Sequence, residues 1–142
     1  MEAALEQARA AVHCGEVPVG AVVTRGGTIV GRGHNLTVER HDLTQHAELI
    51  AMREAMGHLG HDRLEDATLY VTLEPCAQCA GAIVLARVAR VVFGAFDPKA
   101  GMAGSVEDLL RNRKLNHRAE VLAGVMEQEC AELLQTFFEL RR

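Results

Sequence analysis

Aromatic side chains are scarce in this 142-residue chain, which contains one Tyr, four Phe and no Trp. Aliphatic side chains must therefore fill the core, and an apolar fraction of 49% excludes a disordered chain. No apolar run reaches the length of about 18 residues that marks a membrane span. The acidic N-terminus has neither the basic nor the apolar region of a secretory signal peptide. We expect a cytoplasmic protein without membrane contact.

The chain also lacks an overall basic excess, since it contains 15 Lys and Arg and 19 Asp and Glu, which gives a net charge of −4. A basic domain would be the usual sign of nucleic-acid binding. The charge is nevertheless uneven, because residues 87–118 hold seven basic and three acidic side chains. This segment is either a phosphate-binding patch or a solvated face.

The sequence contains no proline- or serine-rich linker and no internal repeat that would divide the chain, so we predict one domain over residues 1–142. Helices are expected over 2–13, 46–56 (ending at Gly57), 75–86 (with Pro75 in its first turn), 106–110 and 126–140. Strands are expected over 19–24, 28–33, 68–73, 88–93 and 119–122, with a hairpin turn at Gly26-Gly27. This alternation predicts an α/β fold, a three-layer α/β/α sandwich with a mixed sheet of about five strands.

Cysteine is rare, and two of the four cysteines form a pair with metal-ligand spacing. Cys76 and Cys79 lie three residues apart at a predicted strand-to-helix junction, so both thiols share one helix face beside the positive end of the helix dipole. This position favours the thiolate, which is the form that binds metal. Cys14 and Cys130 have no such partner and are expected to be small buried residues.

A His-x-Glu motif, His46 and Glu48, begins the predicted second helix. One imidazole and two thiolates are one ligand short of a closed zinc site and leave room for water. Glu48 is then a candidate proton shuttle for that water. Both side chains can reach one ion only from the first turn of their helix, because residues two apart lie on opposite sides of a helix.

Three other interpretations of these residues stay open. Cys76 and Cys79 could form a thioredoxin-like redox pair, although no βαβ context of that kind follows them. A fourth ligand from Cys14, Cys130, His34 or His117 could close a structural zinc site. His46 could also be an ordinary polar helix residue.

The pairing of His46-Ala47-Glu48 with Pro75-Cys76-x-x-Cys79 resembles the zinc-dependent cytidine/deoxycytidylate deaminase superfamily. Within that superfamily the chain resembles the bacterial tRNA-specific adenosine deaminases. The likeness covers nearly the whole chain, including residues 16–22 (EVPVGAV), 67–76 (ATLYVTLEPC) and 91–99 (VVFGAFDPK). At Leu43 and Gln78 the chain departs from residues common in relatives.

The resemblance implies Zn²⁺ held by His46, Cys76 and Cys79, with Glu48 as the proton-transfer carboxylate. It also implies three substrate contacts, from Asn35 to the nucleoside, Asp97 near the RNA backbone and Phe138 near the flanking nucleotides. The implied activity is hydrolytic deamination of adenosine to inosine at the wobble position of a tRNA anticodon loop, by a homodimer. A deaminase of free guanine, cytosine or a nucleoside is the nearest alternative, and a non-catalytic zinc- or RNA-binding subunit is another.

Overall fold

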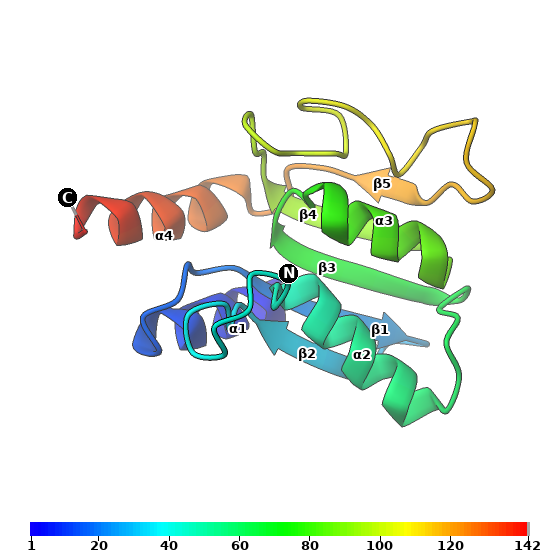
Figure 1. The fold of residues 1–142 in the computed structure, drawn as a ribbon, viewed down its shortest axis with the longest axis horizontal. Helices are drawn as coiled ribbons and strands as arrows, with labels where there is room; N and C mark the ends of the chain where they lie inside the picture. The colour runs from blue at the N-terminus through cyan, green and yellow to red at the C-terminus, as the bar shows by residue number, and fades with distance from the viewer. Residues whose placement is uncertain (142) are drawn as a thin grey trace.

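A mixed five-stranded sheet with strand order β2-β1-β3-β4-β5 forms the centre of the computed structural model, which describes residues 1–141 (Figure 1). β1 pairs antiparallel with β2 and β3, whereas β3, β4 and β5 run parallel. The strands are β1 (Gly20–Arg25), β2 (Thr28–His34), β3 (Ala67–Leu73), β4 (Arg90–Ala95) and β5 (Glu120–Leu122). The predicted mixed sheet is confirmed.

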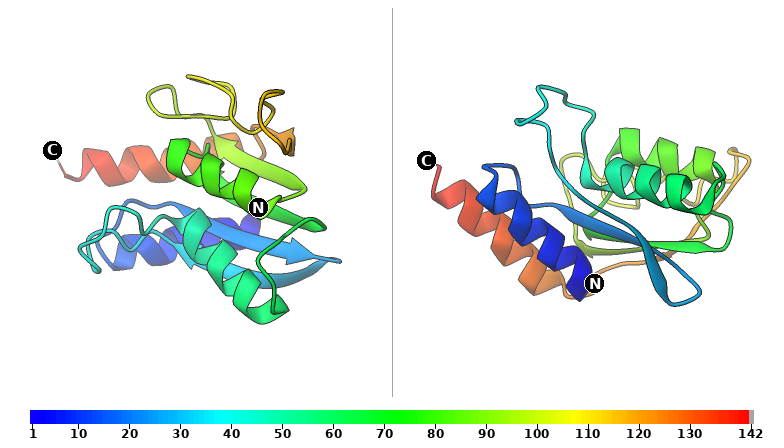
Figure 2. Two further views of the ribbon diagram at one scale, coloured as in Figure 1. Left: turned by 45° about the vertical axis from the view of Figure 1, so that its right-hand side comes forward. Right: turned by 90° about the horizontal axis from the view of Figure 1, so that it is seen from below.

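Two helices cover each face of this sheet. α2 (Ala47–Leu59) and α3 (Ala77–Ala86) lie side by side on one face, and α1 (Glu2–His13) and α4 (Glu127–Glu139) lie on the other (Figure 2). The predicted three-layer sandwich is therefore confirmed. None of the helices within residues 1–141 has the length and apolarity that a membrane span requires.

Aliphatic side chains dominate the core, as the shortage of aromatics requires. Phe93 is the largest fully buried side chain, and the rest of the main core is chiefly Val, Ala, Leu and Ile. The interior strand β4 is buried along almost its entire length because helices cover both of its faces.

Four local predictions are wrong. α2 continues through Gly57 to Leu59 and ends at Gly60, whose φ of 76° is the left-handed conformation that stops helices. Pro75 lies outside α3, which begins after Cys76. Residues 106–110 form bends and a β-bridge between Asp108 and Ala103 instead of a helix, because the N–H groups of Val106 and Leu109 bond to the carbonyl groups of Gly101 and Met102. Cys14 is exposed, whereas Cys130 is buried as predicted.

Glycine allows α2 to lie directly on β2. A Cβ built on Gly33 would come within 2.6 Å of the Ala47 carbonyl oxygen and 2.8 Å of the Ala51 nitrogen. Both are helix backbone atoms that cannot move aside without displacing α2. Gly33 therefore fixes the depth at which the N-terminus of α2 rests on the sheet.

Replacing Gly33 with alanine is expected to lower the free energy of unfolding by at least about 1–3 kcal/mol, the usual cost of overpacking. Gly57→Ala is the matched control, because a Cβ there meets nothing within 4 Å and alanine is the better helix former. That control should raise stability by about 0.5–1 kcal/mol. Urea unfolding of both variants checks this, and a Gly33→Ala protein as stable as the parent would contradict the close approach.

Candidate active site

His46 occupies the N-cap position of α2, in an extended conformation with φ −84° and ψ 151°. Its side chain does not cap the helix. Asn35, at the end of β2, takes over that task, because its Oδ1 accepts a hydrogen bond of 2.9 Å from the Ala47 N–H. The His46 imidazole is thereby left free for another partner.

The imidazole lies against both thiols of the cysteine pair. Nδ1 of His46 is 3.5 Å from Sγ of Cys76 and 3.4 Å from Sγ of Cys79, and all three ligand atoms lie within 4.8 Å of one another. A tetrahedral zinc ion with ordinary bond lengths holds nitrogen and sulfur ligands about 3.5–3.8 Å apart. The three side chains therefore fit a single zinc ion.

The two thiols differ in their readiness to ionise. A hydrogen bond from the Cys79 thiol lowers the pKa of Cys76 to about 3, against the opposing effect of burial. The same interaction with Cys76, together with burial, raises the pKa of Cys79 above its ordinary value. Cys76 is thus ready to bind a cation as a thiolate, and Cys79 needs the cation's own charge to lose its proton.

Glu48 lies in the first turn of α2, two residues after His46, and its side chain is only 4% exposed. Burial raises the pKa of this carboxyl group to about 7. A carboxyl group with a pKa near the working pH can both accept and return a proton. The N-cap placement of His46 also brings the two side chains to the same end of the helix, as the sequence argument requires.

A cavity of about 350 Å³ opens between the two helix N-termini and the sheet. Its volume lies within the usual range for small-molecule sites. This cavity, called the base cavity below, is lined by Val17, Val19, Asn35, Thr37, Leu43, His46, Glu48, Leu73, Glu74, Cys76, Asp97 and Ala100. Predicted residues from four separate segments thus meet around one opening.

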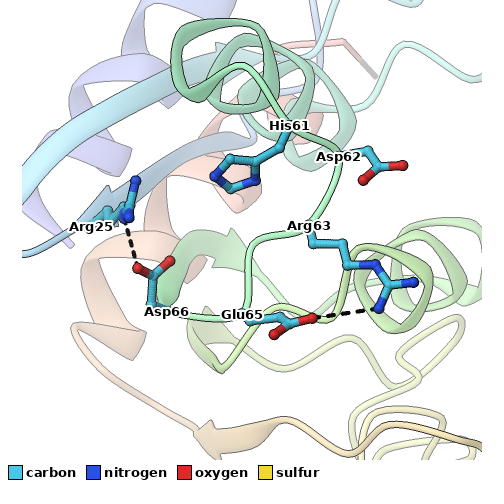
Figure 3. Close-up of a pocket in the computed structure, with 6 residues that line it drawn as sticks. All are labelled: Arg25, His61, Asp62, Arg63, Glu65 and Asp66. Carbon is cyan, nitrogen blue, oxygen red and sulfur yellow. Dashed lines mark hydrogen bonds and ion pairs between the residues drawn. The ribbon is translucent and has the colours of Figure 1, made fainter.

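A larger hollow of about 500 Å³ lies elsewhere, between the end of β1 and the α2–β3 connection (Figure 3). Four of its charged side chains form two ion pairs, Arg25 with Asp66 at 2.7 Å and Arg63 with Glu65 at 3.5 Å. Exposed ion pairs of this kind are common surface features. The group of residues within 1–141 that could hold a metal ion is His46, Cys76 and Cys79, and none of them lines this hollow. Volume alone therefore does not locate the active site.

The three predicted substrate contacts have different surroundings. Asn35 is buried and lines the base cavity while capping α2. Asp97 also lines it, and its Oδ1 accepts hydrogen bonds from the Lys99 and Ala100 N–H groups. Phe138, on α4, lies outside the base cavity, is 51% exposed, and stacks edge-on against Phe137.

Phe138 lines a second hollow of about 390 Å³, called the flanking groove below. This groove shares Val17, Leu73, Asp97 and Ala100 with the base cavity, so the two hollows are contiguous. Its other lining residues are Phe96, Lys99, Leu134 and Phe138.

The basic residues of segment 87–118 are not gathered beside the site. Arg90 begins β4 and pairs with Glu120, and Arg87 follows α3 and donates to the Asn116 carbonyl. Both lie at the amino ends of the parallel strands, whereas the candidate metal ligands lie beyond the carboxyl end of β3. Lys99 is the member of this set that lines the flanking groove.

Sequence reasoning assigned no role to two buried carboxylates beside the base cavity, Glu16 and Glu74. Glu16 accepts hydrogen bonds from the N–H groups of Val38 and Glu39 and from the Thr37 hydroxyl. These bonds fix the loop that carries Leu43, which is 84% exposed at the cavity rim. An acidic residue next to an apolar strand was the available signal in both cases, but the partners lie 21–23 residues from Glu16 and 23–31 residues from Glu74.

The Glu16 carboxylate is expected to make stability depend on acid. Burial alone would raise its pKa, but the hydrogen bonds from Val38, Glu39 and Thr37 hold the pKa below 4.5. A lowered folded-state pKa contributes stability above the unfolded value, and that stability is lost as the pH falls through the folded value. Between about pH 5 and pH 3, wild-type protein should lose stability more steeply than Glu16→Gln. Urea unfolding across this range tests the difference, and parallel curves would contradict it.

Comparison with known proteins agrees with this geometry. The chain matches the MafB19-like deaminase family over residues 1–142. It is 52% identical to a Bacillus subtilis (strain 168) protein named tRNA-specific adenosine deaminase, over 100% of this chain and 89% of the relative. A Haemophilus influenzae protein of the same name is 48% identical, over 100% of this chain and 83% of the relative. A solved structure from a study of A-to-I editing by tRNA:A34 deaminases at the wobble position superposes with a TM-score of 0.91 at 45% identity, covering 94% of this chain and 97% of that one.

Proposed function

The chain belongs to the MafB19-like deaminases and, among them, to the tRNA-specific adenosine deaminases, and from this premise we propose a zinc-dependent wobble deaminase. It converts adenosine to inosine in the anticodon loop of a tRNA. The observation that carries the proposal is the meeting of His46, Cys76 and Cys79 with the buried Glu48 at one cavity, in a chain 52% identical to a named relative.

His46, Cys76 and Cys79 are the residues that would hold the zinc ion. When bound, zinc supplies the Lewis acidity that makes water a nucleophile near neutral pH. Glu48 takes a proton from the attacking water and delivers protons to N1 of the adenine and to the departing amino nitrogen. Adenosine and water thereby yield inosine and ammonia. A carboxyl group with a pKa of about 7 suits this two-way transfer.

An unpaired base suits the base cavity, because a base must leave its stack to reach a buried carboxylate. Extruding a base from a loop costs less than extruding it from a duplex. Val17, Val19 and Leu73 provide apolar walls for the ring, and Asn35 provides a polar contact for the nucleoside.

The flanking groove suits the neighbouring nucleotides. Phe96 and Phe138 are 46% and 51% exposed, and Lys99 adds a positive charge beside them. Exposed aromatic rings stack on unpaired bases, and a lysine neutralises nearby phosphate. Asp97 stands at the boundary between the groove and the base cavity, where the RNA backbone would pass.

A homodimer is part of the proposal. Leu85 is 83% exposed on α3, beside a hollow between α2 and α3 that the half-buried Leu49, Met56 and Ala82 also line. An exposed apolar patch of this kind is typical of an interface. Sedimentation should give twice the mass of one chain. Because tRNA is the substrate, we place the enzyme in the cytoplasm.

The test is to incubate zinc-loaded protein with an anticodon stem-loop RNA and, separately, with free adenosine, guanine and cytosine. Inosine at the wobble position of the RNA is expected, with little ammonia from the free compounds. Preference for a free base would favour a nucleobase deaminase instead. Zinc-loaded protein that deaminates nothing would favour a non-catalytic subunit.

A further inference from the structure

Glu74 directly follows β3 and is 2% exposed, yet it pairs with no basic side chain within residues 1–141. Its partners all belong to one segment, residues 97–105. Oε1 accepts hydrogen bonds from the Asp97 N–H at 3.1 Å and from the Ser105 hydroxyl. Oε2 accepts hydrogen bonds from the N–H groups of Ala103 at 3.0 Å and Ser105 at 3.1 Å. The carboxylate thus accepts hydrogen bonds from N–H groups that have no helix or strand partner in this irregular segment.

The 97–105 segment wraps closely around Glu74 and the next residue. The Met102 N–H donates to the Pro75 carbonyl at 2.8 Å, immediately before the candidate ligand Cys76. At position 101 the backbone passes so near that a Cβ would overlap the Glu74 carboxylate, and this position is glycine. Glu74 therefore ties the segment to the same stretch of chain that carries Cys76.

The segment that Glu74 holds forms part of both hollows of the proposed active site. Asp97 and Ala100 line the base cavity and the flanking groove, and Lys99 lines the groove. Glu74 also lines the base cavity itself. A displacement of this one segment would therefore alter the grip on the target base and on its neighbours together.

We propose that Glu74 is a positioning residue whose carboxylate holds segment 97–105 as the wall shared by the base cavity and the flanking groove. This inference rests on the proposed function, since the wall matters where an RNA loop occupies both hollows. The role differs from that of Glu48, because Glu74 acts through the segment that it orders and transfers no proton.

Glu74→Gln tests the proposal. Glutamine keeps the size of the side chain but turns one oxygen into an NH₂ group that faces N–H donors. Amide hydrogen exchange at Asp97, Ala103 and Ser105 should become at least about tenfold faster. KM for the anticodon stem-loop should rise at least about tenfold with kcat nearly unchanged, the pattern of lost substrate binding. Glu107→Gln, the same change on an exposed side chain of the adjoining loop, is the control and should alter neither.

Ser105→Ala and Ser105→Thr keep the proposal testable if Glu74→Gln fails to fold. The alanine variant removes one of the four donors and should shift exchange and KM in the same direction by a smaller factor, whereas threonine retains the hydroxyl and should restore both. A fall in kcat that matches lost folded protein, with KM and exchange unchanged, would overturn the proposal. If wild-type protein does not act on RNA, the proposed function fails, while the exchange measurement still decides whether Glu74 holds the segment.

Discussion

Glu48→Gln is expected to lower kcat for adenosine deamination in tRNA by at least about 10²–10⁴-fold, the usual contribution of general acid–base catalysis. Glutamine fills the same space but cannot accept a proton from water or return one to the base. Glu48 is not one of the three side chains that meet as metal ligands, so zinc content should stay at the wild-type level. Single-turnover measurement of inosine and metal analysis of the same sample check both parts.

Glu54→Gln is the matched control for this variant, because Glu54 is an exposed glutamate on the same helix. It should retain both turnover and zinc. Burial of the Glu48 carboxylate disfavours its charged form, so Glu48→Gln should not be less stable than wild type. Near-normal turnover of Glu48→Gln would remove this residue from the mechanism, and loss of zinc would make it a ligand instead.

The candidate metal centre could be predicted from sequence because its parts are local. Cys76 and Cys79 start one helix, His46 and Glu48 start another, and each spacing limits where the side chains can point. The sandwich was also predictable, since strand and helix patterns alternate and Gly26-Gly27 marks the antiparallel hairpin. What spacing alone could not give is the contact between the two helix starts, which depends on the packing of α2 and α3 on one sheet.

The wrong helix at 106–110 and the missed role of Glu74 share a cause, which is hydrogen bonding outside the helical pattern of each N–H to the carbonyl four residues earlier. Residues 106–110 have a helical pattern, but the Val106 N–H bonds to the Gly101 carbonyl and the Gly104 N–H to the Glu107 carbonyl. Glu74 bonds to the preceding segment, residues 97–105, which lies 23 to 31 residues further along the chain. The role of Glu74 depends on which backbone N–H groups lack partners in the folded chain, and a local sequence pattern does not contain that information. The basic side chains of residues 87–118 do not gather at the site for a similar reason. Closeness in sequence does not show at which end of a strand a side chain lies.

Cys79→Ala is expected to abolish stoichiometric zinc binding and, with it, all measurable deamination. Cys79 is fully buried and is one of the three ligand atoms that lie within 4.8 Å of one another, so no exposed residue can replace it. Because a ligand that binds only folded protein stabilises it by about 2.7 kcal/mol at a hundredfold excess over Kd, a chelator should lower the melting temperature of wild type. It should leave that of Cys79→Ala unchanged.

Cys14→Ala is the matched control for the loss of a thiol, because Cys14 is exposed and does not belong to the His/Cys/Cys group. It should keep full zinc content, activity and the response to chelator. Cys76→Ala and His46→Ala should behave like Cys79→Ala, since a site with two remaining ligands cannot hold the ion in a fixed position. Stoichiometric zinc in any one of these three variants would exclude that residue as a ligand, and the mechanism would then need another metal site.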